Sequence, residues 1–489
     1  MEAQTQAPLC KHIVMVPIMA RGHLTPFLQL AQKILHHNPI FTITIVNTPL
    51  NINYLRSAIA SHPSPPPQIH LKSLPFNSSD HGLPPNSENA NDLSVAQLIT
   101  LFHASTTLET PLRGFIADMV GGEGSPPACF ISDMLMGWVN DVAKDFGTVN
   151  YAFVTGGAYG TTAFSSIYMN LPHRNTVHGG TLELFSVPGF PESLQFSITQ
   201  LTQNLLDADG ENERSRFFRP QISHCLESHG WLCNTCEEIE TMGCEALRNF
   251  TKLPLWCIGP LLPSNMLKKN CSLDMGPEKK HPYINWLDSY PRNSVLYISF
   301  GSQNTISETQ MMELAKGLAE SKKPFIWVIR PPIGFDLKGE FKPHWLPSDY
   351  EDRIRNQGFM VYDWAPQMDI LCHPSTGAFL SHCGWNSVME SLSQGVPLIG
   401  WPLGAEQGCN AKMLVEEMGV CVVLTIGVKS KIKKEDVKKV IEVVLDENEE
   451  GKGNDMRKKA SDLGELIRAR VEDSSFKAMD DFISTILST

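Results

Sequence analysis

No stretch of the sequence reaches the roughly 18 consecutive apolar residues that a membrane-spanning helix requires. The first residues, MEAQTQAPLCKHIVMVPIM, also lack the basic region that precedes the apolar part of a secretory signal peptide, and the apolar run is short. The sequence thus shows the pattern of neither a membrane protein nor a secreted one. We therefore expect a cytoplasmic protein with no transmembrane segment.

Positive charge is also scarce, since 40 Lys and Arg residues stand against 52 Asp and Glu residues and the net charge is −12. A nucleic-acid-binding surface needs a basic excess or stripe, so we expect no nucleic-acid partner. The 12 cysteines do not indicate a disulfide framework in a chain of 489 residues without a secretion signal. The CNTC motif at 233–236 has no second Cys or His pair at zinc-site spacing, so we expect no metal there.

Two catalytic motifs are missing as well. No G-x-G-x-x-G follows a predicted strand, which argues against a nicotinamide-dependent dehydrogenase. No G-x-S-x-G is present, which argues against a hydrolase with a nucleophile elbow.

What the sequence does contain is an alternation of short apolar runs with helix-like segments, which is typical of a parallel α/β sheet. In the first half the strand-like runs are 12–19, 41–48, 128–133, 150–155 and 230–240. In the second half they are SVLYISFG, PFIWVIR, GFMVYDW, GAFLSHCG and GVPLIGWP. The sequence therefore predicts the α/β class, with two doubly wound domains.

The domain limits are predicted from a change in composition. Residues 255–282 are rich in Pro, Gly and Lys and read as an interdomain linker. They separate an N-terminal domain (1–254) from a C-terminal domain (283–470). In the last segment, 471–489, apolar residues recur at helical spacing, so we expect a helix that packs against the rest of the protein.

The stretch SHCGWNSVMES, 381–391, concentrates polar side chains where a strand runs into a helix. With Ser387 as N-cap, the free N–H groups and the helix dipole favour a phosphate. His382 and Asn386 can add hydrogen-bond donors, and Glu390 can accept hydrogen bonds from a ribose diol. On these residues alone, a purely structural turn with a capping Ser and a buried Trp fits equally well.

A longer segment decides between these interpretations. Residues 364–407, WAPQMDILCHPSTGAFLSHCGWNSVMESLSQGVPLIGWPLGAEQ, resemble almost position for position the 44-residue box of plant UDP-sugar-dependent glycosyltransferases of secondary metabolism. FGSQ at 300–303, WLCNTCEEIE and VPIMARGHLTPFLQLA are similar to further landmarks of that family. The resemblance implies the GT-B fold, in which two Rossmann-like doubly wound domains face each other across a cleft. It also implies a C-terminal helix that returns to the N-terminal domain.

The same resemblance implies a role for individual residues. At the uridine it places Trp364 as a stacking platform for the uracil, together with Ala365, Gln367 and Glu390. At the phosphates it places Ser302, His382, Asn386 and Ser387. At the sugar it places Thr155, Trp385, Glu406 and Gln407.

The catalytic residues implied by the resemblance are His23 and Asp133. His23 follows the first strand, at the sheet edge where ligands bind, and an unperturbed pKa of about 6.5 suits a general base. Asp133 ends a strand and would orient the imidazole and stabilise its protonated form. By themselves, His23 could be structural and Asp133 could cap the next helix. Arg21 departs from the Gln that is common in the family two positions before the histidine, which leaves the acceptor preference open.

The resemblance implies an inverting transfer of glucose from UDP-glucose to a hydroxyl of a flavonoid, other phenolic or terpenoid, which gives a β-glucoside. In this family Gln407 goes with glucose, where His goes with galactose, and Arg in place of Trp385 would favour glucuronic acid. Alternatives are another UDP-sugar, a glycoside as acceptor, or a sugar-nucleotide-binding protein without catalysis. We expect no cofactor and no metal, because the Asp-x-Asp pair at 207–209 lies far from the nucleotide box. The partners are a UDP-sugar and a small-molecule acceptor, and we expect a monomer.

Overall fold

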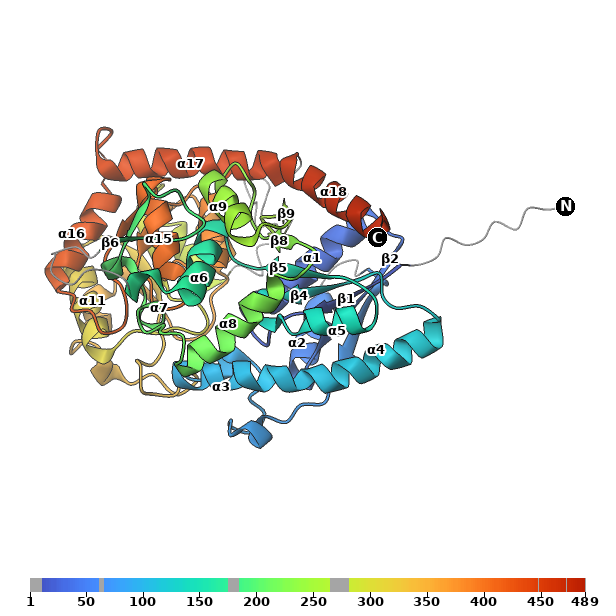
Figure 1. The fold of residues 1–489 in the computed structure, drawn as a ribbon. Helices are drawn as coiled ribbons and strands as arrows, with labels where there is room; N and C mark the ends of the chain where they lie inside the picture. The colour runs from blue at the N-terminus through green and yellow to red at the C-terminus, as the bar shows by residue number, and fades with distance from the viewer. Residues whose placement is uncertain are drawn as a thin grey trace.

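The protein carries two parallel β-sheets, each covered by helices (Figure 1). The computed structural model describes residues 11–60, 66–174, 184–263, 281–446, 448–471 and 473–488. In spatial order the first sheet comprises β3 (Ile69–Ser73), β2 (Phe41–Asn47), β1 (Lys11–Val16), β4 (Cys129–Asp133), β5 (Asn150–Val154), β8 (Trp231–Cys233) and β9 (Leu255–Cys257). The second comprises β12 (Gly358–Val361), β11 (Phe325–Val328), β10 (Val295–Ser299), β13 (Thr376–Ser381), β14 (Leu398–Gly400) and β15 (Cys421–Val423). The predicted α/β class with two doubly wound units is confirmed.

The strands are continuous apolar runs because both faces of each sheet are covered. Every residue of β4, β5 and β10 is buried, as expected for parallel strands between helical layers. In each sheet the strand order reverses beside the first strand, so that β1 lies between β2 and β4, and β10 lies between β11 and β13. Loops that follow such strands diverge and leave room for a ligand at the carboxyl edge. We refer to the parts built on the two sheets as the N-terminal and C-terminal domains.

The helices of the N-terminal domain are α1 (Arg21–His37), α2 (Pro49–Ala60), α3 (Val95–Ser105), α4 (Glu109–Glu123), α5 (Val139–Asp145), α6 (Ala158–Asn170), α7 (Gln203–Leu206), α8 (Glu213–Cys225) and α9 (Thr241–Thr251). Those that follow are α10 (Pro282–Leu287), α11 (Glu308–Ser321), α12 (Tyr350–Ile354), α13 (Gln367–Cys372), α14 (Trp385–Ser393), α15 (Gln407–Glu416), α16 (Lys434–Val444), α17 (Lys452–Val471) and α18 (Ser474–Ser488). A two-stranded antiparallel ribbon, β6 (Leu184–Ser186) and β7 (Gln195–Ser197), lies beside the sheets. Among the described residues, no helix combines the length and apolar character needed to cross a membrane.

The last two helices connect the domains. In Figure 1, α17 runs along the top of the molecule from the side of α16, and α18 continues it over the first sheet. The apolar stripe of α18 is buried in the same core as β1 and α1, through Met479, Phe482, Ile483 and Ile486. Lys11 donates to the carbonyls of Ile486 and Leu487 and so fixes the end of α18.

The structure corrects several local expectations. Of the predicted strand 230–240, only Trp231–Cys233 is extended. The edge strands β3, β9 and β15 were not predicted, because β9 and β15 have three residues each and β3 is mostly exposed to solvent. β9 occupies the beginning of the predicted linker and extends the first sheet, whereas residues 264–280 of that linker lie outside the described residues.

Candidate active site

His23 and Asp133 meet at the reversal point of the first sheet. β1 and β4 are neighbours, so the beginning of α1 and the end of β4 lie at the same edge. The Nδ1 of His23 lies 2.6 Å from Oδ2 of Asp133. Asp133 is almost completely buried, with 1% of its side chain exposed, whereas 28% of the His23 side chain is exposed. His23 was expected in a loop, but α1 begins at Arg21, so it lies in the first turn of the helix.

The hydrogen bonds of Asp133 determine which nitrogen of His23 can act as a base. Oδ1 of Asp133 accepts from the N–H of Leu135, so the carboxylate caps the following turn with one oxygen and faces His23 with the other. Asp133 therefore caps the following turn, which was the alternative role considered for it, and also contacts His23. An ionised carboxylate only accepts hydrogen bonds, so Nδ1 must carry the proton. The lone pair is then on Nε2, which can accept a proton from an acceptor hydroxyl.

The surroundings of His23 favour its protonated form. Burial alone would lower its pKa, but the negative charge and hydrogen bond of Asp133, together with the charge of Glu406, raise it. The hydroxyl of Thr155 also lies 3.1 Å from Nδ1. Thr155 was expected at the sugar, and the structure places it beside the dyad at the end of β5.

Pro26 explains how α1 contacts the C-terminal domain. Pro26 lies inside α1 and has no N–H, so the carbonyl of Gly22 lacks its helical i+4 partner. That carbonyl instead accepts a hydrogen bond of 2.9 Å from Nδ2 of Asn386. Asn386 was predicted at the phosphates; it lies in the first turn of α14 and contacts the first turn of α1, which carries His23.

The predicted phosphate ligands gather where β10 and β13 end. Gly384, rather than Ser387, is the N-cap of α14, so Ser387 lies in the first turn. A Cβ atom added to Gly301 or Gly384 would lie within 3.0 Å of the His382 ring, so both glycines allow this close packing. Burial lowers the pKa of His382 to about 4, and its ring is therefore neutral near pH 7.

The predicted uridine ligands form a connected group. The side chain of Trp364 is 73% exposed, which leaves its ring available for stacking, and Ala365 behind it is buried. Nε2 of Gln367 donates to Ser387 Oγ at 3.0 Å and to Glu390 Oε2 at 2.5 Å. Burial raises the pKa of Glu390 to about 7, although the hydrogen bond from Gln367 acts in the opposite direction.

The predicted sugar ligands differ in the hydrogen bonds that they already form within the protein. The Oε1 of Gln407 accepts from the N–H groups of Leu403 and Gly404, at 2.9 Å each, so its amide NH₂ is the group left to meet a sugar. Burial raises the pKa of Glu406. Trp385 is buried, and its indole N–H donates to the carbonyl of Asn234 at 2.7 Å. The indole N–H of Trp385 thus forms a contact between the domains, and its place at the sugar stays a prediction.

Sequence reasoning missed the polar residues that join the two domains around this site. Asn234, inside the CNTC motif, donates to the Thr155 carbonyl at 3.3 Å, accepts from the Leu261 N–H at 2.7 Å and receives the Trp385 indole. The CNTC motif was considered only as a metal site, which was not expected there, so the role of its asparagine was not considered. Both Cys233 and Cys236 are buried free thiols.

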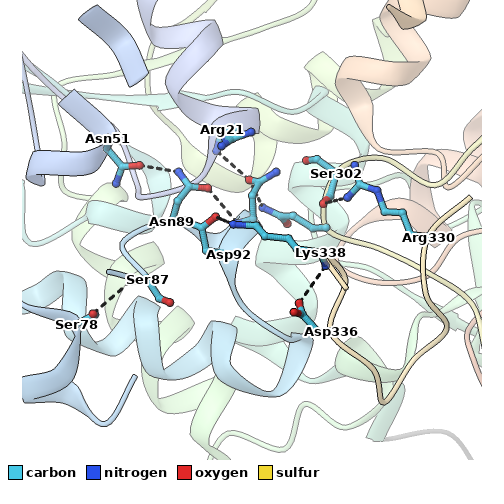
Figure 2. Close-up of polar contacts among 12 residues, drawn as sticks. Arg21, Asn51, Ser78, Ser87, Asn89, Asp92, Ser302, Arg330, Asp336 and Lys338 are labelled. Atoms are coloured by element: carbon cyan, nitrogen blue, oxygen red, sulfur yellow. Dashed lines mark hydrogen bonds and ion pairs between the residues drawn. The ribbon is translucent and has the colours of Figure 1, made fainter. Parts of the chain in front are cut away.

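A second set of interdomain contacts surrounds the N–H of Arg21 (Figure 2). Asn91 Oδ1 lies 3.4 Å from that N–H and 3.3 Å from Nε2 of Gln303. Lys338 forms an ion pair of 2.5 Å with Asp92. The sequence could not reveal the contacts of Gln303 and Lys338, because they join residues more than 200 positions apart.

Residues 256–461 match the family model described as "UDP-glucoronosyl and UDP-glucosyl transferase". The UDP-glycosyltransferase 92A1 of Arabidopsis thaliana is 41% identical over 484 residues, which cover 96% of this chain and 96% of that protein. Crocetin glucosyltransferase 3 of Crocus sativus is 41% identical over 456 residues, covering 91% of this chain and 92% of that protein. A solved Polygonum tinctorium UDP-glucosyltransferase capable of glucosylating indoxyl has a TM-score of 0.79 and 28% identity, covering 99% of this chain and 100% of that chain.

Proposed function

This chain belongs to the plant UDP-glycosyltransferase family, and on that premise we propose that it transfers glucose from UDP-glucose to a hydroxyl group of a small plant metabolite. The family and the GT-B fold shared with solved relatives establish an enzyme that moves a glycosyl group from a UDP-sugar to a small-molecule acceptor. The identity of the sugar, the acceptor group and the residues that perform the transfer are parts of the proposal.

The observation that carries the proposal is the 2.6 Å contact between His23 and Asp133. In the proposed reaction, Nε2 of His23 takes the proton of the acceptor hydroxyl while the acceptor oxygen attacks C1 of the sugar. The bond between C1 and the β-phosphate oxygen breaks, and its electron pair leaves with UDP. Asp133 stabilises the imidazolium that forms. A single displacement of this kind inverts the anomeric carbon, so an α-linked donor gives a β-glucoside.

Glucose is proposed from two positions of the donor box. Gln407 corresponds to the residue that goes with glucose in the resembling family, and its side-chain NH₂ is left for a sugar hydroxyl. Trp385 stands where an Arg would favour glucuronic acid. The printed names of the Crocus sativus and Polygonum tinctorium proteins also describe glucosyltransferases. We propose a phenolic or terpenoid hydroxyl as acceptor, and transfer without a metal ion.

The test is an acceptor screen with UDP-glucose in the presence of EDTA, which follows UDP release and product mass. Phenols, triterpenoids and their glycosides serve as acceptors, and UDP-galactose, UDP-xylose and UDP-glucuronic acid serve as alternative donors. We expect the wild type and His36→Ala, a control at the exposed end of the same helix, to add one hexose to at least one acceptor. We expect His23→Ala to lose this activity. Transfer by His23→Ala at the wild-type rate would refute the role of His23, and a preference for another donor would refute the choice of glucose.

A further inference from the structure

The phosphate ligands predicted for this site provide hydrogen bonds but no full positive charge. Ser302, Asn386 and Ser387 have neutral side chains, and His382 is neutral near pH 7 because its pKa is about 4. The N-terminus of α14 adds a partial positive charge from its peptide dipoles. The diphosphate of a sugar nucleotide carries more than one negative charge, and UDP gains further charge as it leaves. A positive side chain near Ser302 would therefore stabilise both the bound donor and the leaving group.

Arg330 is such a side chain. It follows β11, which pairs with β10, so it lies beside the loop that continues β10 and carries Ser302. Its Nη1 donates to the Ser302 carbonyl, as Figure 2 shows, so one edge of the guanidinium is fixed against the predicted phosphate loop. A guanidinium has five N–H donors in a planar arrangement that suits phosphate oxygens. This one contact leaves most of those donors available.

Arg21 brings a second positive charge toward the same place from the N-terminal domain. It begins α1, directly before Gly22, whose carbonyl is bonded to Asn386. Its guanidinium lies over the ring of Tyr54, 5.3 Å from the ring centre. Burial lowers the pKa of Arg330, and the positive charge of Arg21 acts in the same direction.

Neither guanidinium has a carboxylate partner within the part of the chain that the structure describes. In that part, Lys338 forms an ion pair with Asp92, whereas Arg21 and Arg330 form none. A guanidinium without a carboxylate partner has donors that suit the oxygens of a bound anion. Arg330 contacts the Ser302 carbonyl, and Arg21 directly precedes Gly22, which accepts a hydrogen bond from Asn386, so both belong to elements that carry the predicted diphosphate ligands.

We propose that Arg330 and Arg21 bind the diphosphate of the sugar nucleotide and supply the positive charge that stabilises UDP as it leaves. This inference rests on the proposed placement of the phosphates at Ser302, His382 and Asn386. It adds two residues to the donor site, one from each domain, so that the diphosphate itself connects the two domains. In this role, Arg21 serves the donor rather than the acceptor.

The test compares the binding of UDP, UMP and uridine by calorimetry to the wild type, Arg330→Met and Arg21→Met. Arg330→Lys retains the charge, and Lys338→Met removes a neighbouring cation that already has a partner. We expect each arginine-to-methionine change to weaken UDP binding about tenfold to a hundredfold, because a hydrogen bond to a charged group is lost in each case. Uridine binding should stay unchanged, Lys at position 330 should restore part of the UDP affinity, and Lys338→Met should bind UDP like the wild type.

The outcomes separate this inference from the proposed function. If the wild type does not bind UDP, the proposed function itself fails. If the wild type binds UDP and both methionine variants bind it equally well, the inference fails alone, and the arginines serve another anion such as an acceptor carboxylate. If the variants lose UDP and uridine affinity to the same degree, the arginines only support the loop structure, and the inference is again wrong. Should Arg330→Met fail to fold, Arg21→Met and Arg330→Lys still decide the question.

Discussion

Asp133 performs a separate task with each of its carboxylate oxygens. Oδ1 accepts from the Leu135 N–H and holds the turn after β4, whereas Oδ2 contacts Nδ1 of His23. The turn therefore fixes the carboxylate, and the carboxylate fixes the imidazole. The contact with Asp133 also raises the pKa of His23, so this residue influences both the position and the protonation of the imidazole.

Asp133→Asn tests this control through the pH dependence of the reaction. His23 must be neutral to act as a base, so in the wild type the rate should fall as the pH drops through a pKa above the ordinary 6.5. Without the charge of Asp133, burial is the largest remaining influence and lowers that pKa. We expect the acidic limb of kcat/KM to move to lower pH while kcat falls about 10²- to 10⁴-fold. Asp145→Asn, which removes a surface ion pair with Arg113, should change neither quantity. An unshifted acidic limb in Asp133→Asn would contradict the pairing.

Trp364 allows binding and stability to be separated. With 73% of its side chain exposed, it contributes little to the core, so Trp364→Ala should leave the melting temperature almost unchanged. Loss of stacking on the uracil should weaken UDP binding by about one to two orders of magnitude. Trp364→Phe keeps an aromatic face and should lose less. Equal UDP affinity in the wild type and Trp364→Ala, measured by calorimetry, would show that the uracil lies elsewhere.

At the scale of single elements, helix starts show where sequence reasoning succeeded and where it stopped. The position of α14 was predicted from SHCGWNSVMES, but Ser387 was expected as its N-cap and Gly384 fills that position. The Oγ of Ser387 is instead used by Gln367, a partner 20 residues away that no local pattern reveals. Periodicity therefore located the helix, and long-range contacts determined what its first turn does.

The strands show the same contrast between local pattern and long-range contacts. The central strands β1, β4, β5, β10 and β13 are mainly apolar and buried, and were predicted within a few residues. Their pairing brings His23 to Asp133 and Ser302 to His382, and this pairing follows from the doubly wound topology. The site residues were identified by resemblance to a family, because composition and spacing alone left structural alternatives open. Arg330 and Asn234 were missed because their function depends on contacts across the fold.

Two glycines test how closely the elements pack near Asp133. A Cβ at Gly137 would lie 2.1 Å from the backbone oxygen of Gln221 on α8, and a backbone atom cannot turn away. Gly137→Ala should therefore lower the stability by about 1–3 kcal/mol. Gly114 lies inside α4 with nothing within 4 Å of an added Cβ, so Gly114→Ala should gain about 0.5–1 kcal/mol. Thermal unfolding that ranks the two variants the other way would refute this packing.

At the scale of the whole molecule, the C-terminal helix holds the chain together. Phe482 on α18 is fully buried, with its ring centre 5.0 Å from that of Tyr151 on β5 and 5.3 Å from that of Trp256 on β9. Phe482→Ala should cost about 3–5 kcal/mol and lower the melting temperature by several degrees. Leu487 lies one turn further on and is 39% exposed, so Leu487→Ala should have a much smaller effect. Equal effects of the two changes on thermal unfolding would show that α18 does not dock as described.

The two domains meet through residues that also belong to the site. Asn386 reaches the Gly22 carbonyl, the Trp385 indole reaches the Asn234 carbonyl, and Glu406 raises the pKa of His23 from the other domain. The proposed base and the proposed donor ligands are therefore positioned by one another, and neither domain forms the site alone. This arrangement predicts a single displacement in which the acceptor and UDP lie on opposite faces of the sugar.

The most direct test of this account is the anomeric configuration of the first product, followed by proton NMR while the enzyme consumes UDP-glucose and an acceptor found in the screen. We expect a β-glucoside, recognised by the large coupling constant of its anomeric proton, from the first turnovers onward. An α-glucoside as the first-formed product would contradict the single displacement, and with it the role assigned to His23 and Asp133.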